Sequence, residues 1–187
     1  MEARRITAPL DSQTARSLRA GERVLLSGVV YTARDAAHKK LCGLLASGGE
    51  PPFELEGAVI YYCGPAPAPA GFPMGSAGPT SSYRMDVFVP ELMERGLLGM
   101  IGKGPRSEAV RRAVMRCGGV YFAATGGAGA LLAGCVQSAE LVAWPELGPE
   151  ALRRLTVKDM PLTVALDSEG RDLYTEGPAA WLKSLNK

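Results

Sequence analysis

The sequence predicts an α/β fold with a largely parallel central sheet, and two observations lead to that prediction. Short apolar runs rich in β-branched residues alternate with segments whose apolar residues recur at helical spacing. Glycines separate the two kinds of segment and end the helical patterns. The chain has 187 residues, 47% of them hydrophobic and 21% charged, so we expect a single domain over residues 1–187 with short flexible termini.

Each strand is expected where an apolar run lies between turn signals. The run RVLLSGVVYTA is typical, because it is β-branched and follows Gly21. The expected strands cover residues 23–33, 57–63, 97–101, 119–124, 139–144 and 161–167.

Helices are expected between these strands. RDAAHKKLCGLLASGG predicts a helix that begins at Arg34 and stops at Gly48 and Gly49. Residues 106–117 predict an amphipathic helix, and residues 127–134 a helix of small residues. A further helical pattern over 85–93 contains Pro90, which predicts a kink or a new helix start there.

Composition excludes two classes of partner. A net charge of +2 and an aromatic content of 6% argue against nucleic acid. The uncharged stretch 117–139 is long enough to span a bilayer, but it contains six glycines, and we interpret it as a strand, a turn and a helix. The first residues, MEARRITAPL, contain no apolar signal run. We therefore expect no membrane association and a cytoplasmic location.

The cysteines give no metal motif. Cys42, Cys63, Cys117 and Cys135 are widely spaced, and His38 is the single histidine. Neither a zinc site nor an iron–sulfur cluster is expected within this chain, and the thiols are expected to be reduced.

Three loops that follow expected strands each contain a cation. Arg34 follows the first strand, Arg84 follows the second and Lys103 follows the third. Because parallel strands end at the same edge of a sheet, sites gather in such loops. Arg34 also begins a helix, where a cation opposes the helix dipole, and this mismatch indicates anion binding.

The segment GSAGPTSSYRMD, which contains Arg84, predicts a small anion site. Gly75 and Gly78 allow close backbone approach, and Thr80 lies where a helix N-cap is expected. Arg84 would then share a helix face with Thr80, beside free backbone N–H groups. An ordinary cap with Arg84 in a surface ion pair is the alternative.

The run from Lys103 through Arg106 to Arg116 is interpreted as a solvated helix face. Residues 97–104 and 127–132 resemble nucleotide-binding loops, but both fail the required patterns.

Two arginines, a lysine and a threonine suit a dicarboxylate ligand, because guanidinium groups bind carboxylates in a bidentate way. Few residues in the chain could break a C–O bond unaided. The sequence therefore predicts part of an active site.

Five motifs together resemble the class I fumarate hydratase β subunit, which is equivalent to the C-terminal domain of the single-chain enzymes. This family includes L(+)-tartrate dehydratase β subunits. The resemblance covers nearly the whole chain. The motifs are YTARDAAHKK, GAVIYYCGPAPA, GSAGPTSSYRMD, GMIGKG and YFAATGGAGALLA.

The resemblance implies a swivelling β/β/α domain and a shared active site. In the family, a separate α subunit holds a 4Fe–4S cluster and supplies the acid for the leaving hydroxyl. By position in the motifs, Arg34, Arg84 and Lys103 would bind the substrate, and Thr80 would be the catalytic base at C3. The resemblance also implies an α2β2 assembly. This sequence departs from the family at Tyr83, where the family usually has a smaller residue.

Three functions stay open from sequence. The first is reversible hydration of fumarate to (S)-malate by an α/β complex, with the isolated chain inactive. The second is dehydration of L-tartrate to oxaloacetate, because both substrates are C4 dicarboxylates. The third is an anion-binding or assembly module without catalysis.

Overall fold

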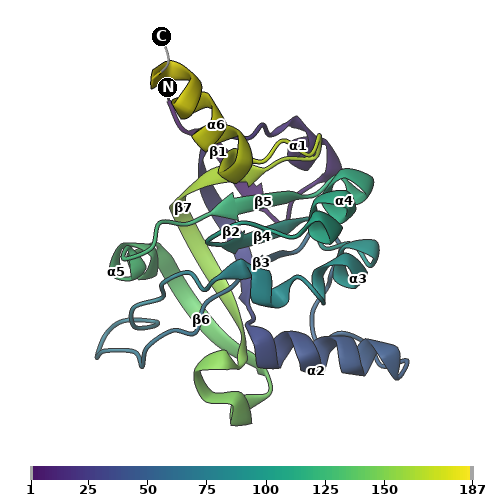
Figure 1. The fold of residues 1–187 in the computed structure, drawn as a ribbon. Helices are drawn as coiled ribbons and strands as arrows, with labels where there is room; N and C mark the ends of the chain where they lie inside the picture. Colours follow the sequence, from purple (N-terminus) through teal and green to yellow (C-terminus); the bar gives the residue numbers. More distant parts are fainter. Residues whose placement is uncertain (1, 186–187) are drawn as a thin grey trace.

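A seven-stranded sheet forms the centre of the structure, a computed structural model that describes residues 2–185 (Figure 1). The strands lie in the order β1-β2-β3-β4-β5-β7-β6. In chain order they are β1 (Arg4–Ala8), β2 (Arg23–Thr32), β3 (Val59–Tyr61), β4 (Gly99–Gly102), β5 (Val120–Ala123), β6 (Val136–Ala143) and β7 (Leu152–Leu166).

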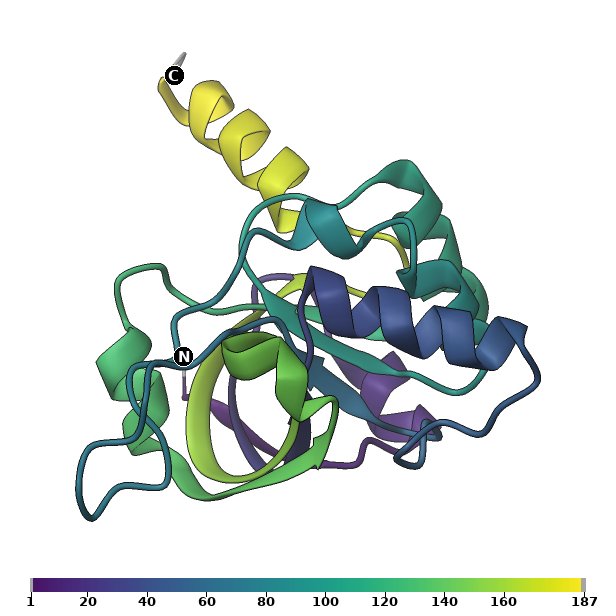
Figure 2. The same cartoon turned by 90° about the horizontal axis from the view of Figure 1, so that it is seen from below.

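The sheet is mixed and partly closed, so the prediction of a largely parallel sheet is confirmed only in part. Neighbouring strands from β1 to β5 are parallel, whereas β7 runs antiparallel to β2, β5 and β6. Because β7 pairs with both β5 and β2, the strands from β2 to β5 and β7 close into a ring. The curvature that this closure requires is visible along β7 in Figure 2.

Helices α2, α3 and α4 pack together on one side of the sheet (Figure 1). Pro90 lies in the first turn of α3, which confirms the prediction of a new helix start. The helices are α1 (Ser12–Ser17), α2 (Asp35–Ala46), α3 (Val89–Glu94), α4 (Glu108–Cys117), α5 (Gly129–Gly134) and α6 (Leu173–Leu185), with two 3₁₀ helices, η1 (Ser82–Met85) and η2 (Pro145–Glu150).

The core lies on both faces of the sheet, as alternation along β3 shows. Val59 and Tyr61 contribute to the cluster that contains β1 and β7 residues, whereas Ile60 and Tyr62 pack against α2, α3 and α4. Successive side chains of a strand point to opposite faces, so a strand covered on both sides is apolar throughout. This double coverage holds the ends of β2, β3 and β4 in place.

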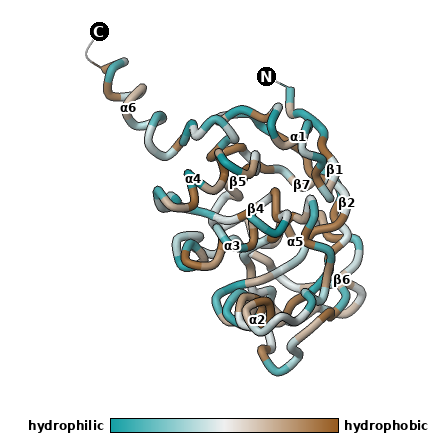
Figure 3. Tube along the Cα trace, turned by 90° about the vertical axis from the view of Figure 1, so that its right-hand side faces the viewer, coloured by the Kyte–Doolittle hydropathy of each residue, from teal (hydrophilic) through white to brown (hydrophobic). Residues whose placement is uncertain are grey.

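Three segments were not expected from sequence: β1 with α1, the first half of β7, and α6. The first half of β7 alternates between buried and partly exposed residues and includes Arg153 and Arg154, so its charges mask an apolar run. Helix α6 projects from the body with no buried residue (Figures 1 and 2). Its trace mixes hydrophilic and hydrophobic residues (Figure 3). Residues 1, 186 and 187, to which the flexible-terminus prediction also applies, lie outside the described residues.

The uncharged stretch 117–139 folds as predicted, into a strand, a turn and a helix. It contains β5, the turn around Gly127 and α5, and ends in β6. Over residues 2–185, no helix has both the length and the apolar character needed to cross a membrane.

Candidate functional site

The predicted site residues follow the carboxyl ends of three neighbouring parallel strands. Thr32 at the end of β2 pairs with Tyr61 at the end of β3, and Tyr61 pairs with Ile101 of β4. Arg34 follows β2 and Lys103 follows β4, while the long loop after β3 leads to Thr80. The prediction that these loops meet at one edge of the sheet is confirmed.

Thr80 is bound by backbone hydrogen bonds between the ends of β3 and β4. Its N–H donates to the carbonyl of Tyr62 at 2.6 Å, and the N–H of Lys103 donates to the carbonyl of Thr80 at 3.2 Å. The Ser82 N–H then donates to the Lys103 carbonyl at 2.9 Å. Thr80 and Lys103 are therefore fixed side by side at the backbone.

The predicted N-cap at Thr80 is wrong. The helical turn begins at Ser82 as the 3₁₀ helix η1, and its N-cap is Ser81, whose side chain makes no capping bond. Because both backbone groups of Thr80 bond to neighbouring strand ends, the residue continues the sheet and does not start a helix. Contrary to the prediction from sequence, Thr80 and Arg84 therefore do not share a helix face.

Arg34 lies at the N-cap of α2, as predicted, and contacts two carboxylates. Its Nη2 lies 3.1 Å from Glu150 Oε1 and 3.8 Å from Asp35 Oδ2. Its side chain makes no capping hydrogen bond, and its Nε is buried without a partner among the described residues. The guanidinium therefore retains a free donor next to a helix N-terminus.

Asp35 joins the two arginines. Its Oδ2 also lies 3.1 Å from Nη1 of Arg84. The sequence gave no indication of these ion pairs or of Glu150, which comes from η2 and also accepts a hydrogen bond from the Ala36 N–H at 3.3 Å. Long-range contacts of this kind leave no local pattern.

Lys103 is exposed and makes no salt bridge among residues 2–185. A Cβ at Gly126 would lie 3.9 Å from its Cδ, so the Thr125–Gly127 turn after β5 is also close. Within residues 2–185, Arg34 and Arg84 form ion pairs with Asp35 and Glu150 and Lys103 forms none, so these five side chains together retain a net positive charge. Such a site attracts a small anion.

A buried polar layer lies directly beneath these loops. Arg106 forms an ion pair with Asp86, with Nε 2.7 Å from Oδ1, and its side chain is only 1% exposed. The guanidinium lies over the rings of Tyr62 and Tyr121. The interpretation of Arg106 as part of a solvated basic face is therefore wrong, whereas Arg112 and Arg116 on the same stretch are exposed.

His38 is also completely buried. Its Nδ1 lies 2.9 Å from the Arg34 carbonyl, and a carbonyl only accepts, so Nδ1 carries the proton. Burial lowers the pKa of His38 from 6.5 to about 4. The imidazole is neutral at pH 7 and supports the backbone of Arg34.

The cysteines do not form a ligand set. All four are free, and residues 2–185 contain no group of three or more His, Cys, Asp or Glu side chains able to hold a metal. Burial raises the pKa of Cys42 to about 11 and raises that of Cys63 further. These two thiols are therefore protonated at neutral pH when no metal is bound. The described residues therefore do not fit an iron–sulfur cluster.

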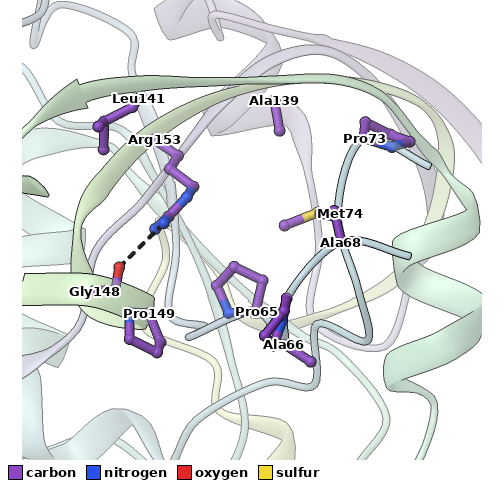
Figure 4. Close-up of a pocket in the computed structure, with 11 residues that line it drawn as sticks. Pro65, Ala66, Ala68, Pro73, Met74, Ala139, Leu141, Gly148, Pro149 and Arg153 are labelled. Atoms are coloured by element: carbon purple, nitrogen blue, oxygen red, sulfur yellow. Dashed lines mark hydrogen bonds between the residues drawn. The ribbon is translucent and has the colours of Figure 1, made fainter. Parts of the chain in front are cut away.

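A cavity of about 460 Å³ lies beside the site, between the loop after β3, β6 and η2 (Figure 4). Its walls are mostly proline, alanine and other apolar side chains, and Arg153 is the cation among them. Arg153 already donates to the Gly148 carbonyl at 3.1 Å. None of the four predicted site residues lines this cavity.

The fold and the site define an α/β domain with a cationic site at the carboxyl edge of its parallel strands. Residues 2–177 match the family model described as Fumarase C-terminus. The chain belongs to this family.

Curated relatives of two lengths resemble the chain. It is 41% identical over 156 residues to "Fumarate hydratase class I, anaerobic" of Escherichia coli, covering 82% of this chain and 28% of that protein. It is 36% identical to "Putative L(+)-tartrate dehydratase subunit beta" of Methanocaldococcus jannaschii, covering 95% of this chain and 94% of that protein. The chain thus spans little more than a quarter of the Escherichia coli relative and nearly the whole archaeal one.

Proposed function

We propose that this chain is the β subunit of an iron–sulfur-dependent hydro-lyase that hydrates fumarate reversibly to (S)-malate. The observation that supports this most is the meeting of Arg34, Arg84, Lys103 and Thr80 at one edge of the sheet in a member of the fumarase family. The chain supplies carboxylate-binding and base residues, and is inactive alone. Residues 1–187 would form a single domain of the swivelling β/β/α type, in the cytoplasm.

The remaining part of the active site comes from a cluster-bearing α subunit in this proposal. The Escherichia coli relative is more than three times as long as the matched part, and the archaeal relative is named a subunit beta. A 4Fe–4S cluster held by that partner would act as a Lewis acid toward the substrate hydroxyl. We propose an α2β2 assembly.

Arg34 and Arg84 would bind one substrate carboxylate in this chain. Asp35 occupies only part of each guanidinium, at 3.8 Å and 3.1 Å, so further N–H donors remain for an incoming anion. Both arginines and Asp35 are partly exposed, so a substrate carboxylate can compete for these donors. Lys103, which has no acidic partner among residues 2–185, would bind the other polar end.

Thr80 would remove the proton from C3 while the hydroxyl leaves C2, which converts malate into fumarate and water. Backbone hydrogen bonds on both of its sides fix its position, and its hydroxyl makes no hydrogen bond among the described residues. A threonine hydroxyl is a weak base. The positive charge of Lys103 and Arg84 would favour its alkoxide form.

Dehydration of L-tartrate to oxaloacetate is the second candidate. The archaeal relative, named a putative L(+)-tartrate dehydratase subunit beta, matches this chain along 94% of its own length. Tyr83, beside Arg84, is 65% exposed and is the residue most suited to distinguish the substrates or to contact the partner. An anion-binding module without catalysis is the third.

The test is anaerobic co-expression with the α-type chain, followed by turnover of malate and L-tartrate side by side. We expect malate turnover that needs both chains, and a fall of about 100-fold or more in Thr80→Ala and Arg84→Ala. Arg95→Ala, an exposed arginine on the edge of α3, is the matched control and should turn over normally. Unchanged turnover in both site variants contradicts the assignment, and a complex with an intact cluster that turns over neither acid favours the binding module.

A further inference from the structure

The buried ion pair of Arg106 and Asp86 connects two segments that are 20 residues apart. Their side chains are 1% and 8% exposed, and the guanidinium lies 4.8 Å from the centre of the Tyr121 ring and 5.4 Å from that of Tyr62. Asp86 ends the segment that begins at Thr80, and Arg106 ends the loop that begins at Lys103.

The hydrogen bonds around this pair bind the same two segments to each other. Asp86 Oδ2 accepts from the Ser107 N–H at 2.6 Å. The Tyr121 hydroxyl donates to the Gly104 carbonyl at 2.9 Å, so its oxygen accepts from the Ser82 hydroxyl, also at 2.9 Å. Ser82 is the last residue of the backbone ladder that joins Thr80 to Lys103, and Gly104 directly follows Lys103.

The pair is poorly arranged to add stability. Arg106 Nη2 is buried without a partner among the described residues, and Nη1 contacts only the sulfur of Met100, a weak acceptor, at 3.4 Å. A buried pair repays its desolvation only when its remaining protons are satisfied, and apolar replacements are often neutral. Fixing the relative position of two segments is the better explanation for charges at this place.

We propose that Arg106 and Asp86 are positioning residues, which hold the segment of Thr80 and Arg84 in register with the loop of Lys103. The proposal rests on the proposed function, because these are the residues that would bind and deprotonate the acid. Neither Arg106 nor Asp86 is itself placed in contact with the substrate.

The experiment compares Arg106→Met with the double variant Arg106→Met/Asp86→Asn in the α/β complex. The single variant leaves a buried carboxylate unpaired, so both the urea midpoint and kcat/KM should fall, kcat/KM by roughly 10–100-fold. The double variant removes both charges, so its midpoint should return close to that of the native protein while kcat/KM remains low. Arg116→Met, an exposed arginine of α4, is the control and should change neither.

Two results overturn the proposal: native kcat/KM in the single variant, or recovery of kcat/KM together with stability in the double variant. A purely structural role predicts the second result, because activity would then follow the folded fraction.

Amide hydrogen exchange of the isolated chain separates this proposal from the proposed function. In the double variant the N–H groups of Ser82 and Lys103 should exchange faster, while that of Val164, bonded to the Glu22 carbonyl, keeps its native rate. If the native complex turns over neither acid, the proposed function fails and this readout still tests the positioning. Unchanged exchange at Ser82 and Lys103 overturns it.

Discussion

Two aspartate–arginine pairs lie at the same end of the sheet and differ in how much water reaches them. Asp35 and Arg84 are 3.1 Å apart with side chains 35% and 38% exposed, whereas Asp86 and Arg106 are 2.7 Å apart and almost completely buried. Water and salt screen the first pair, so its arginine can exchange one carboxylate for another. The second arginine has no route to a ligand, and its effect is on the geometry of the chain.

The largest expected difference between the pairs is in stability. Asp86→Ala leaves a buried guanidinium unpaired and the Ser107 N–H without its acceptor, so the free energy of unfolding should fall by about 3–5 kcal/mol. Asp35→Ala should cost less than about 1 kcal/mol, because its pair is half in water. Urea denaturation of the isolated chain measures both. Equal losses would show that burial does not separate the two pairs.

His38 lies between the two pairs, and its titration shows where the water-excluded region begins. It contacts Arg34 through the backbone carbonyl and Tyr62 through its ring, and burial lowers its pKa to about 4. Below pH 6.5 the unfolded chain binds a proton that the folded chain does not bind until about pH 4. The contribution of neutral His38 to the free energy of unfolding should therefore be fully present above pH 6.5. It should fall by about 3 kcal/mol as the pH drops to 4.

The measurement is urea denaturation between pH 4 and 7, with His38→Gln as the matched control. The variant keeps a polar side chain without a titrating group, so its profile should be flatter by that amount, with only carboxylate titration left. Because His38 is the single histidine, its NMR signal also reports its pKa directly. A measured pKa near 6.5 would place His38 in contact with water and would contradict its assignment to the water-excluded region.

The parts of the fold that sequence predicted are those with a clear apolar period. β2, β4, β5, α2 and α4 appear within a few residues of their expected bounds. In the first half of β7 the charged residues Arg153 and Arg154 hide the alternation of buried and partly exposed positions, and α6 has no buried residue at all. Closure of the sheet through β7 was therefore not predictable from local patterns.

The site could be predicted only in part for a related reason. Arg34, Arg84 and Lys103 follow strand ends, so parallel topology alone places them together. The positions of Glu150 and Arg106 depend on contacts across 116 and 20 residues, which sequence does not record locally. Arg106 was assigned to a solvated helix face because it belongs to a run of basic residues, and its burial depends on the rings of Tyr62 after β3 and Tyr121 in β5.

The smallest expected effect on stability is that of Arg34→Ser. It tests whether Arg34 serves function at an N-cap position, where serine is normally preferred. Helix α4 has Ser107 as its N-cap, which accepts from the Val110 N–H, whereas α2 has Arg34, which makes no capping bond. Arg34→Ser should add a cap worth about 0.5–1 kcal/mol and lose a partly exposed ion pair of similar size, so stability should change by less than about 1 kcal/mol.

The reciprocal change, Ser107→Arg, removes a cap without adding an anion site, and should lose about 1 kcal/mol by urea denaturation. In the α/β complex Arg34→Ser should turn over malate about 100-fold more slowly, while Ser107→Arg should remain active once corrected for folded fraction. Native turnover in Arg34→Ser, or a loss of stability above about 2 kcal/mol, would show that this arginine serves the fold. A small cost in stability with a large loss of turnover would instead show that Arg34, like Arg84 of the exposed pair, serves the site and not the fold.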